Sequence, residues 1–328
     1  MRFGVFDQLE VSDVPLHQLY RERLAFIEQC DQAGIWCYHK SEHHFIPLDA
    51  APNPTVFLAA AAERTTSIRL GPLVYLLPFH HPLRLAEDIC MLDHLSGGRV
   101  ELGVGRGISI PEIELWGLDP EAAQARYEES LEVVLQALQS SSLTHEGTHF
   151  SFRDVPIQLA PFQRPFPPLW YPGNIETAAK AGMSTIIGGP LPVVTEKIAQ
   201  YREQLRPRTD SSHEPSIGVV HRVYVADTDA EARARVRSTW ATMTARLTPL
   251  FKQWNLIPPN DPTLGGDVDL ALRLNVCLAG SPATVRAYVE QFEAESGTDY
   301  FVGCFTWGDL THEESTRSFA RFAVHVMR

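Results

Sequence analysis

Four consecutive residues, Glu42-His43-His44-Phe45, place a carboxylate, two imidazoles and an aromatic ring side by side. They follow the apolar run Ile35-Trp36-Cys37-Tyr38, which is predicted to be a strand after a helix that ends at Gly34. Histidine is the side chain whose unperturbed pKa allows it to exchange protons near neutral pH. We therefore predict acid–base chemistry at His43 and His44, although a histidine pair on the surface or in the core would have the same local sequence.

Short apolar runs alternate with longer amphipathic segments along most of the chain, which is the pattern of a parallel sheet with helical connections. Eight such units predict a (β/α)8 TIM barrel with insertions. A doubly wound fold would need a glycine-rich dinucleotide loop after the first strand, and Phe6-Asp7-Gln8-Leu9 is not one. The predicted strands are Arg2–Phe6, Ile35–His39, one beginning with Ile68–Leu70, Arg99–Val104, Leu169–Tyr171, Thr185–Ile187, Ser216–Ala226 and Tyr300–Cys304.

Two stretches interrupt this alternation. Residues 139–167 hold no βα unit and are predicted to be an insertion with a small hairpin at Thr144–Phe152. Residues 249–279, rich in Pro and Gly, are predicted to be an irregular insertion and a candidate active-site lid. The whole chain, residues 1–328, is interpreted as a single barrel domain. Its expected helices are Pro15–Ala33, Thr55–Arg64, Leu83–Leu95, Pro120–Leu138, Ile175–Ala181, Val193–Leu205, Ala230–Leu247, Ala283–Ser296 and Glu313–Met327.

Composition excludes several classes of function. The net charge of −12 and the absence of a Lys/Arg-rich run argue against a nucleic-acid or anionic-membrane partner. No apolar run approaches the ~18 residues that a membrane span needs. The five cysteines are scattered and form no CxxC pair, which is typical of a reduced, cytoplasmic protein. The chain opens directly into a strand, so we expect no signal peptide.

Residues at the carboxyl ends of barrel strands form the active face. The fourth predicted strand ends in Gly105-Arg106-Gly107, and the fifth is followed by Gly173 and Asn174 at the start of a helix. An arginine fork suits a phosphate, and so do the free backbone N–H groups at a helix start. These loops predict a phosphorylated cofactor with its tail between strands four and five.

Aromatic side chains recur at the predicted active face and would supply an apolar cover that excludes water. They are Phe6, Phe45, Tyr75, Phe79 and Trp307. Near the end of the seventh strand, one of His221 and Arg222 must also turn inward because neighbours in a strand alternate, and the sequence leaves open which one. A metal site on His39, His43 and His44 would need further ligands at other strand ends, so no metal is predicted.

The chain resembles the bacterial luciferase-like, flavin-dependent monooxygenase family over nearly its whole length. The last βα unit, from Gly280-Ser281-Pro282-Ala283 to Trp307-Gly308, is also similar to that family. The third and fourth of the segments that carry the resemblance are highly specific at their observed spacing. The four segments are Phe3-Gly4-Val5-Phe6, Gly34 with Glu42-His43-His44-Phe45, the run 76–88 (LLPFHHPLRLAED) and the run 92–107 (LDHLSGGRVELGVGRG).

The resemblance implies a two-component enzyme. A separate reductase would supply reduced FMN, which reacts with O2 to form a peroxyflavin that oxygenates a small, mostly apolar substrate, and the protein would be a homodimer. His43 matches the family's active-site histidine and His44 its neighbour in the motif. Leu73-Val74 match the pair under the isoalloxazine ring, often joined by a cis peptide. Arg106 matches the phosphate-binding arginine, and Gly173, Asn174 and Thr177 match the strand-five phosphate loop more loosely.

Three departures from the family pattern leave questions open. The strand-five loop is short, His39 stands where the family often has Trp, and Gly105 stands where the luciferases have a reactive Cys, so nothing favours light emission. Two alternatives to the monooxygenase interpretation are open. One is hydride transfer with the deazaflavin F420 on the same barrel, and the other is flavin binding without catalysis.

Overall fold

The computed structural model describes residues 1–210, 213–253 and 266–327, and it is a closed barrel of parallel strands. β1 pairs with β2 and β12, β10 pairs with β12 and β9, and bridges at Leu70–Val100 and Trp170–Ser184 complete the ring. The predicted (β/α)8 barrel is confirmed. The barrel strands are β1 (Arg2–Asp7), β2 (Cys37–Lys40), β3 (Arg69–Pro72) with β4 (Tyr75–Leu76), β5 (Leu102–Gly105), β8 (Leu169–Trp170), β9 (Thr185–Ile187), β10 (Ile217–Val225) and β12 (Tyr300–Cys304).

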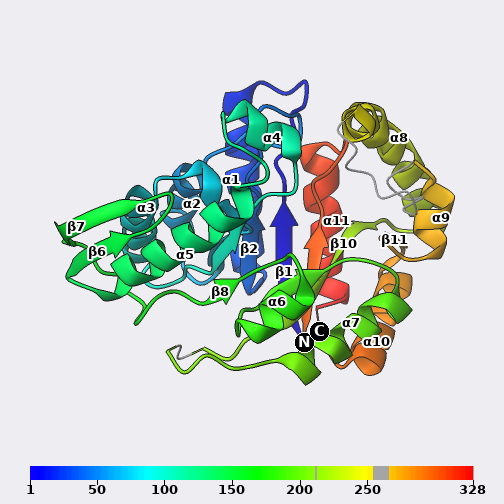
Figure 1. Cartoon of the computed structure of the whole chain (residues 1–328). Helices are drawn as coiled ribbons and strands as arrows, with labels where there is room; N and C mark the ends of the chain where they lie inside the picture. The colour runs from blue at the N-terminus through cyan, green and yellow to red at the C-terminus, as the bar shows by residue number, and fades with distance from the viewer. Residues whose placement is uncertain (211–212, 254–265, 328) are drawn as a thin grey trace.

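Helices surround the barrel, and the main apolar core lies between them and the strands (Figure 1). The two termini lie together at one end, while β1 points toward the end where α4 and α8 lie. Among the described residues, no helix combines the length and the apolar character that crossing a membrane requires. The helices are α1 (Leu16–Gln32), α2 (Pro54–Ala62), α3 (Pro82–Leu95), α4 (Ile110–Leu115), α5 (Ala123–Gln139), α6 (Ile175–Lys180), α7 (Leu191–Gln204), α8 (Asp229–Gln253), α9 (Val268–Arg273), α10 (Pro282–Ser296) and α11 (His312–His325), with a 3-10 turn at Leu77–Phe79.

The two predicted insertions differ in outcome. In residues 139–167, β6 (Ser142–Glu146) and β7 (Ser151–Pro156) form the expected antiparallel hairpin. Residues 249–279 are not uniformly irregular, because α8 continues through Pro249 to Gln253, α9 follows, and β11 (Cys277–Gly280) pairs in parallel with β10. The strand escaped prediction because its four residues include none of the β-branched or aromatic types that favour strands. Residues 254–265 of the candidate lid lie outside the described residues.

A polar cluster fills the interior of the barrel. His39 is completely buried, and its Nε2 lies 2.7 Å from the Tyr300 hydroxyl. Beside it, the Trp170 indole N–H donates to the carboxylate of Glu101, which Arg69 also contacts. Burial lowers the pKa of His39 to about 3, so its ring is neutral at physiological pH. His39 therefore belongs to the barrel interior. The presence of His at this position, where the family often has Trp, does not alter the residues that line the mouth of the barrel.

Candidate active site

A cavity of about 770 Å³, partly open to solvent, lies at the carboxyl ends of β1, β2, β4, β5 and β8. We call it the central cavity. It brings together nine of the residues predicted from the sequence, although they come from six separate segments of the chain. These are Phe6, His43, Leu73, Val74, Phe79, Arg106, Gly173, Asn174 and Thr177.

A buried ion pair fixes the loop that carries His43. The Lys40 ammonium at the end of β2 lies 2.6 Å from Asp49, and both side chains are completely buried. Asp49 also accepts hydrogen bonds from the backbone N–H groups of His43 (3.3 Å) and Ala51 (2.8 Å). Because a buried carboxylate needs its partners, this pair holds the loop after β2 in one conformation.

Glu112 orients the imidazole of His43. The His43 Nδ1 lies 3.4 Å from one oxygen of Glu112, and the other oxygen accepts a 2.6 Å hydrogen bond from the backbone of His44. Glu112 belongs to α4, where Ser109 caps the helix by accepting from its backbone N–H (3.3 Å). A neutral ring that donates from Nδ1 has its lone pair on Nε2. Contact with Glu112 through Nδ1 therefore leaves the Nε2 atom of His43 free of that carboxylate, beside the central cavity.

Sequence reasoning missed both α4 and Glu112. The available signal was Ser109-Ile110-Pro111-Glu112, since Ser followed by Glu three residues later, with Pro at an early helical position, marks a helix start. Even so, the signal does not predict the observed contact, because the Glu112 side chain reaches the loop after β2 rather than its own helix cap.

Glu42 holds two other histidines. One of its oxygens accepts from the Nε2 atoms of His44 and His80, each at 2.8 Å, and the other accepts from the Leu76 backbone at 2.9 Å. Burial by itself raises the pKa of Glu42, but the hydrogen bonds from His44 and His80 outweigh it and lower the pKa to about 2. Burial opposes the charge on His80, yet its hydrogen bond to Glu42 leaves the pKa of this histidine raised. We call this group the Glu42 clamp.

His44 does not line the central cavity, in contrast to the prediction of a catalytic role. Its ring nitrogen is engaged by Glu42, and its ring packs edge-on against Phe79 and Trp116. The two adjacent histidines therefore have different environments, and only His43 borders the cavity. His44 connects the loop after β2 to the start of α3.

Three of the five aromatic residues predicted to cover the site lie elsewhere. Phe45 is 66% exposed, with a positive φ of 63° that turns its ring away. Tyr75 is completely buried and shares a 2.7 Å hydrogen bond with Thr55 of α2, because strand alternation directs it out of the barrel. Trp307 is 4% exposed and packs edge-on against Trp240. Phe6 and Phe79 do line the central cavity.

The lining of the central cavity combines a close backbone approach with polar groups that are free to meet a ligand. The Leu73–Val74 peptide is cis, and a Cβ at Gly105 would lie 2.7 Å from the Val74 side chain, so only glycine fits there. The Ser41 hydroxyl at this cavity is buried and has no hydrogen-bond partner among the described residues, which leaves it available to a ligand. Arg106 lines the same space, and its Nε donates to the Gly107 carbonyl at 3.0 Å.

The opposite wall is the loop after β8. Asn174 caps α6 by accepting from the Thr177 backbone at 2.9 Å and lies 3.3 Å from the Thr177 hydroxyl. The Asn174 side-chain oxygen is therefore already engaged, and so is the hydroxyl proton of Thr177, which leaves the Asn174 amide nitrogen as a free side-chain donor at this wall.

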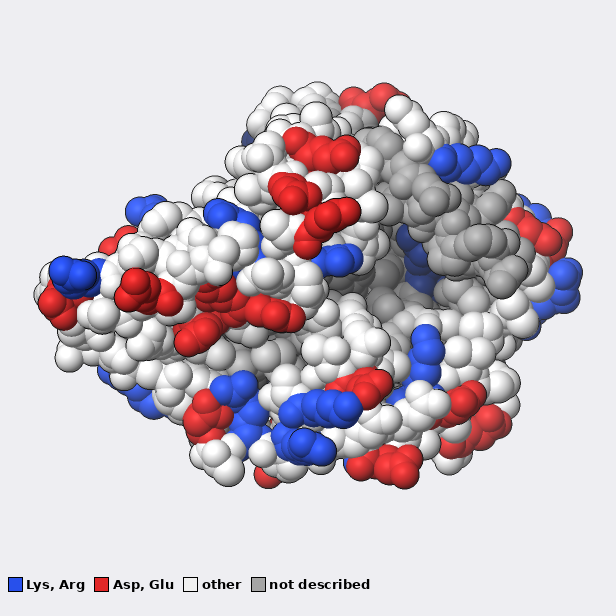
Figure 2. Space-filling model, in the orientation of Figure 1, with Lys and Arg blue, Asp and Glu red and all other residues white. Residues whose placement is uncertain are grey.

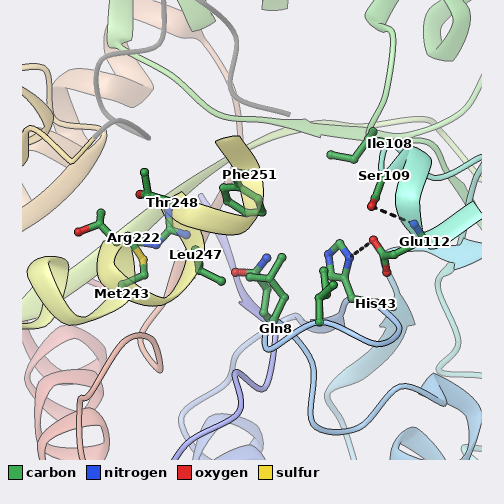
Figure 3. A pocket seen from close by; sticks show the side chains of 13 residues that line it. Gln8, His43, Ile108, Ser109, Glu112, Arg222, Met243, Leu247, Thr248 and Phe251 are labelled. Carbon is green, nitrogen blue, oxygen red and sulfur yellow. Dashed lines mark hydrogen bonds and ion pairs between the residues drawn. The ribbon is translucent and has the colours of Figure 1, made fainter. Parts of the chain in front are cut away.

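A second cavity of about 200 Å³, also partly open, adjoins the first (Figure 3). We call it the lateral cavity. His43, Ile108, Ser109 and Glu112 line both cavities. Arg222 lines the lateral cavity, whereas His221 is buried and stacks on Phe301, so the structure shows which of the two residues faces the mouth. Burial lowers the pKa of His221 to about 4.

A family model described as luciferase-like monooxygenase matches residues 1–300. The chain belongs to this family. It is an enzyme of the oxidoreductase class, in line with the monooxygenases to which it is similar. His43 and Arg106 at the central cavity are therefore interpreted as residues of a luciferase-like monooxygenase.

Individual relatives agree with this assignment. The chain is 35% identical over 322 residues to protein y4wF of Sinorhizobium fredii, a match that covers 96% of this chain and 93% of that protein. It is 30% identical over 244 residues to the oxygenase component of a flavin-dependent trigonelline monooxygenase from Acinetobacter baylyi, covering 71% and 67%. The oxygenating constituent of 3,6-diketocamphane monooxygenase from Pseudomonas putida, solved with FMN, shares the fold with a TM-score of 0.82 at 23% identity, covering 99% of this chain and 98% of that one.

Proposed function

We propose that this luciferase-like monooxygenase binds reduced FMN in the central cavity and uses O2 to oxygenate a small, mostly apolar organic substrate. The observation that carries the proposal is that His43 and Arg106 line one cavity. In the proposal, His43 accepts a proton and Arg106 binds the flavin phosphate. Reduced flavin would supply the electrons that activate oxygen. The trigonelline enzyme is named as flavin-dependent, and the diketocamphane enzyme was solved with FMN, which supports this choice.

Each residue of the site has a part in this proposal. Arg106 pairs with the phosphate, while the Gly173 backbone and Thr177 face the same anion from the other wall. Leu73 and Val74 support the flat ring, and Phe6 and Phe79 keep water from it. His43, held by Glu112, moves a proton at its Nε2 atom.

Further partners follow from the same proposal. The name "oxygenase component" of the trigonelline relative supports a separate flavin reductase for this chain. A homodimer is supported by the exposed apolar residues Val56 on α2 and Met91 and Leu95 on α3, which would be buried by a second copy. The described structure shows all five cysteines as free thiols, which supports a reducing, cytoplasmic location.

Anaerobic titration of the purified protein with reduced FMN, oxidised FMN and F420 tests the proposal. It is followed by rapid mixing of the reduced complex with oxygenated buffer. We expect preferential binding of reduced FMN and an oxygen-dependent change in the flavin spectrum. Preference for F420 without oxygen uptake would move the protein to hydride transfer. Flavin binding without any reaction with oxygen would make it a non-catalytic binding protein.

A further inference from the structure

The lateral cavity has a charged or titratable group at each end and mostly apolar side chains between them, together with Gln8 (Figure 3). His43 and Glu112 lie at one end and Arg222 at the other, with Leu247 and Phe251 between them (Figure 3). Ile46, Leu48 and Met243 complete the apolar wall. A molecule that fills this cavity must therefore be apolar along its body, and it meets a guanidinium at the end remote from His43.

Arg222 lacks an anionic partner among the described residues. Its guanidinium makes no hydrogen bond there and no ion pair within 4 Å, and its nearest aromatic contact is the Trp240 ring at 5.9 Å. The nearby carboxyl of Glu10 responds to the charge of Arg222 but stays beyond ion-pair distance. A half-buried charge beside apolar side chains is costly unless an anion accompanies it. The charge of Arg222 therefore lacks a direct anionic partner, which a bound ligand would supply.

The flavin phosphate does not meet this need. Arg106 borders the central cavity and Arg222 borders only the lateral one. The two arginines therefore line different cavities, and a phosphate bound by Arg106 in the central cavity would not supply the anion at Arg222. Figure 2 shows basic side chains within the hollow of this face, although acidic side chains gather on the surface beside it. With a net charge of −12, a positive group in a cavity marks a local requirement for an anion.

We propose that Arg222 determines substrate specificity, and that the substrate is an apolar carboxylate whose anionic group binds Arg222 while its remote end reaches His43. This inference rests on the proposed function for the chemistry at His43, but the recognition step does not require flavin. Two parallel hydrogen bonds from a guanidinium match a carboxylate in geometry and charge. A substrate with only a neutral oxygen would gain one weaker bond.

Calorimetric titration of the flavin-free, full-length protein with octanoate and 1-octanol tests the proposal, because the two probes share their apolar body and differ in the head group. We expect octanoate to bind about tenfold to a hundredfold more tightly than octanol, as hydrogen bonds between charged groups allow. Arg222→Met should abolish that preference and leave octanol binding unchanged. Arg222→Gln, which keeps a polar end beside Glu10, gives the same test if the methionine variant does not fold.

Two matched control variants each remove one positive charge outside the lateral cavity. Arg106→Met removes it from the central cavity, and Arg237→Met removes it from the exposed face of α8, where Arg237 pairs with Asp269 at 2.8 Å. Both should retain the preference for octanoate. Equal binding of the two probes to the wild type, or an equal loss in Arg106→Met, would overturn the proposal. Failure of the proposed function would instead appear as the absence of reduced-FMN binding and oxygen uptake, with this binding pattern intact.

Discussion

Replacement of Glu42 by Gln tests whether an ionised carboxylate organises the loop that carries His43. Three N–H groups, from His44, His80 and the Leu76 backbone, point at the two oxygens of Glu42. A glutamine has one acceptor oxygen, and its NH2 group would face one of these donors. The substitution therefore removes the charge and leaves at least one buried donor without a partner.

The size of the effect follows from the pKa of Glu42. A fall from the ordinary 4.5 to about 2 corresponds to about 3 kcal/mol of stability carried by the ionised form. Because the folded pKa is the lower one, this stability is present above pH 4.5 and is lost as the pH falls toward 2. The raised pKa of His80 acts in the opposite sense, since its contribution is present below pH 6.5 and is lost as the pH rises through the raised value. Both contributions are present together between pH 4.5 and 6.5.

Urea unfolding across the pH range measures this effect. At pH 6 we expect Glu42→Gln to lower the free energy of unfolding by about 3 kcal/mol, and the difference from wild type should shrink to about half near pH 3. The matched control is Glu87→Gln on α3, whose side chain is 60% exposed, and it should change stability by less than about 0.5 kcal/mol. A loss that is independent of pH, or equal in the two variants, would refute an ionised clamp.

Three further predictions concern the same mouth. His43→Ala should leave flavin binding largely intact and slow substrate oxidation ~100-fold or more, measured as product formed per reduced flavin; unchanged turnover would exclude His43 as the proton-transfer group. Arg106→Ala should weaken reduced FMN by about tenfold to a hundredfold in anaerobic titration, with little effect on reduced riboflavin, which has no phosphate; equal losses for both would place Arg106 away from the phosphate. Lys40→Met leaves Asp49 buried and unpaired, so we expect unfolding free energy to fall by about 3–5 kcal/mol, with recovery when Asp49→Leu is added; a double variant as unstable as the single one would contradict this reason.

The barrel strands could be predicted because their signal is local. Apolar runs such as Arg2–Phe6 and Thr185–Ile187 lie between polar segments, and the structure places strands on them. β11 has no such signal, since Cys277-Leu278-Ala279-Gly280 contains no β-branched or aromatic residue, and it pairs with the carboxyl-terminal part of β10. Its pairing depends on long-range contact, which periodicity does not record.

The site could be predicted only in part, for a geometric reason. The sequence of a strand shows that its side chains alternate between two faces, but not which face points into the barrel. The sequence therefore places Tyr75 at the mouth although its ring points outward, and it does not decide between His221 and Arg222. The contact between His43 and Glu112 joins residues 69 apart in the chain. Residue type and position after a predicted strand located His43 and Arg106, and the resemblance to a family agreed with both, whereas Glu112 and the wall of the lateral cavity required the three-dimensional structure.

The central and lateral cavities share a wall, because both are lined by His43, Ile108, Ser109 and Glu112. A ligand in either cavity therefore meets the same four side chains. If a molecule in the lateral cavity raises the affinity for flavin by some factor, bound flavin raises the affinity for that molecule by the same factor. Titration of one ligand with the other at saturation measures this factor, and Glu112 of α4 is the shared residue whose replacement should change it.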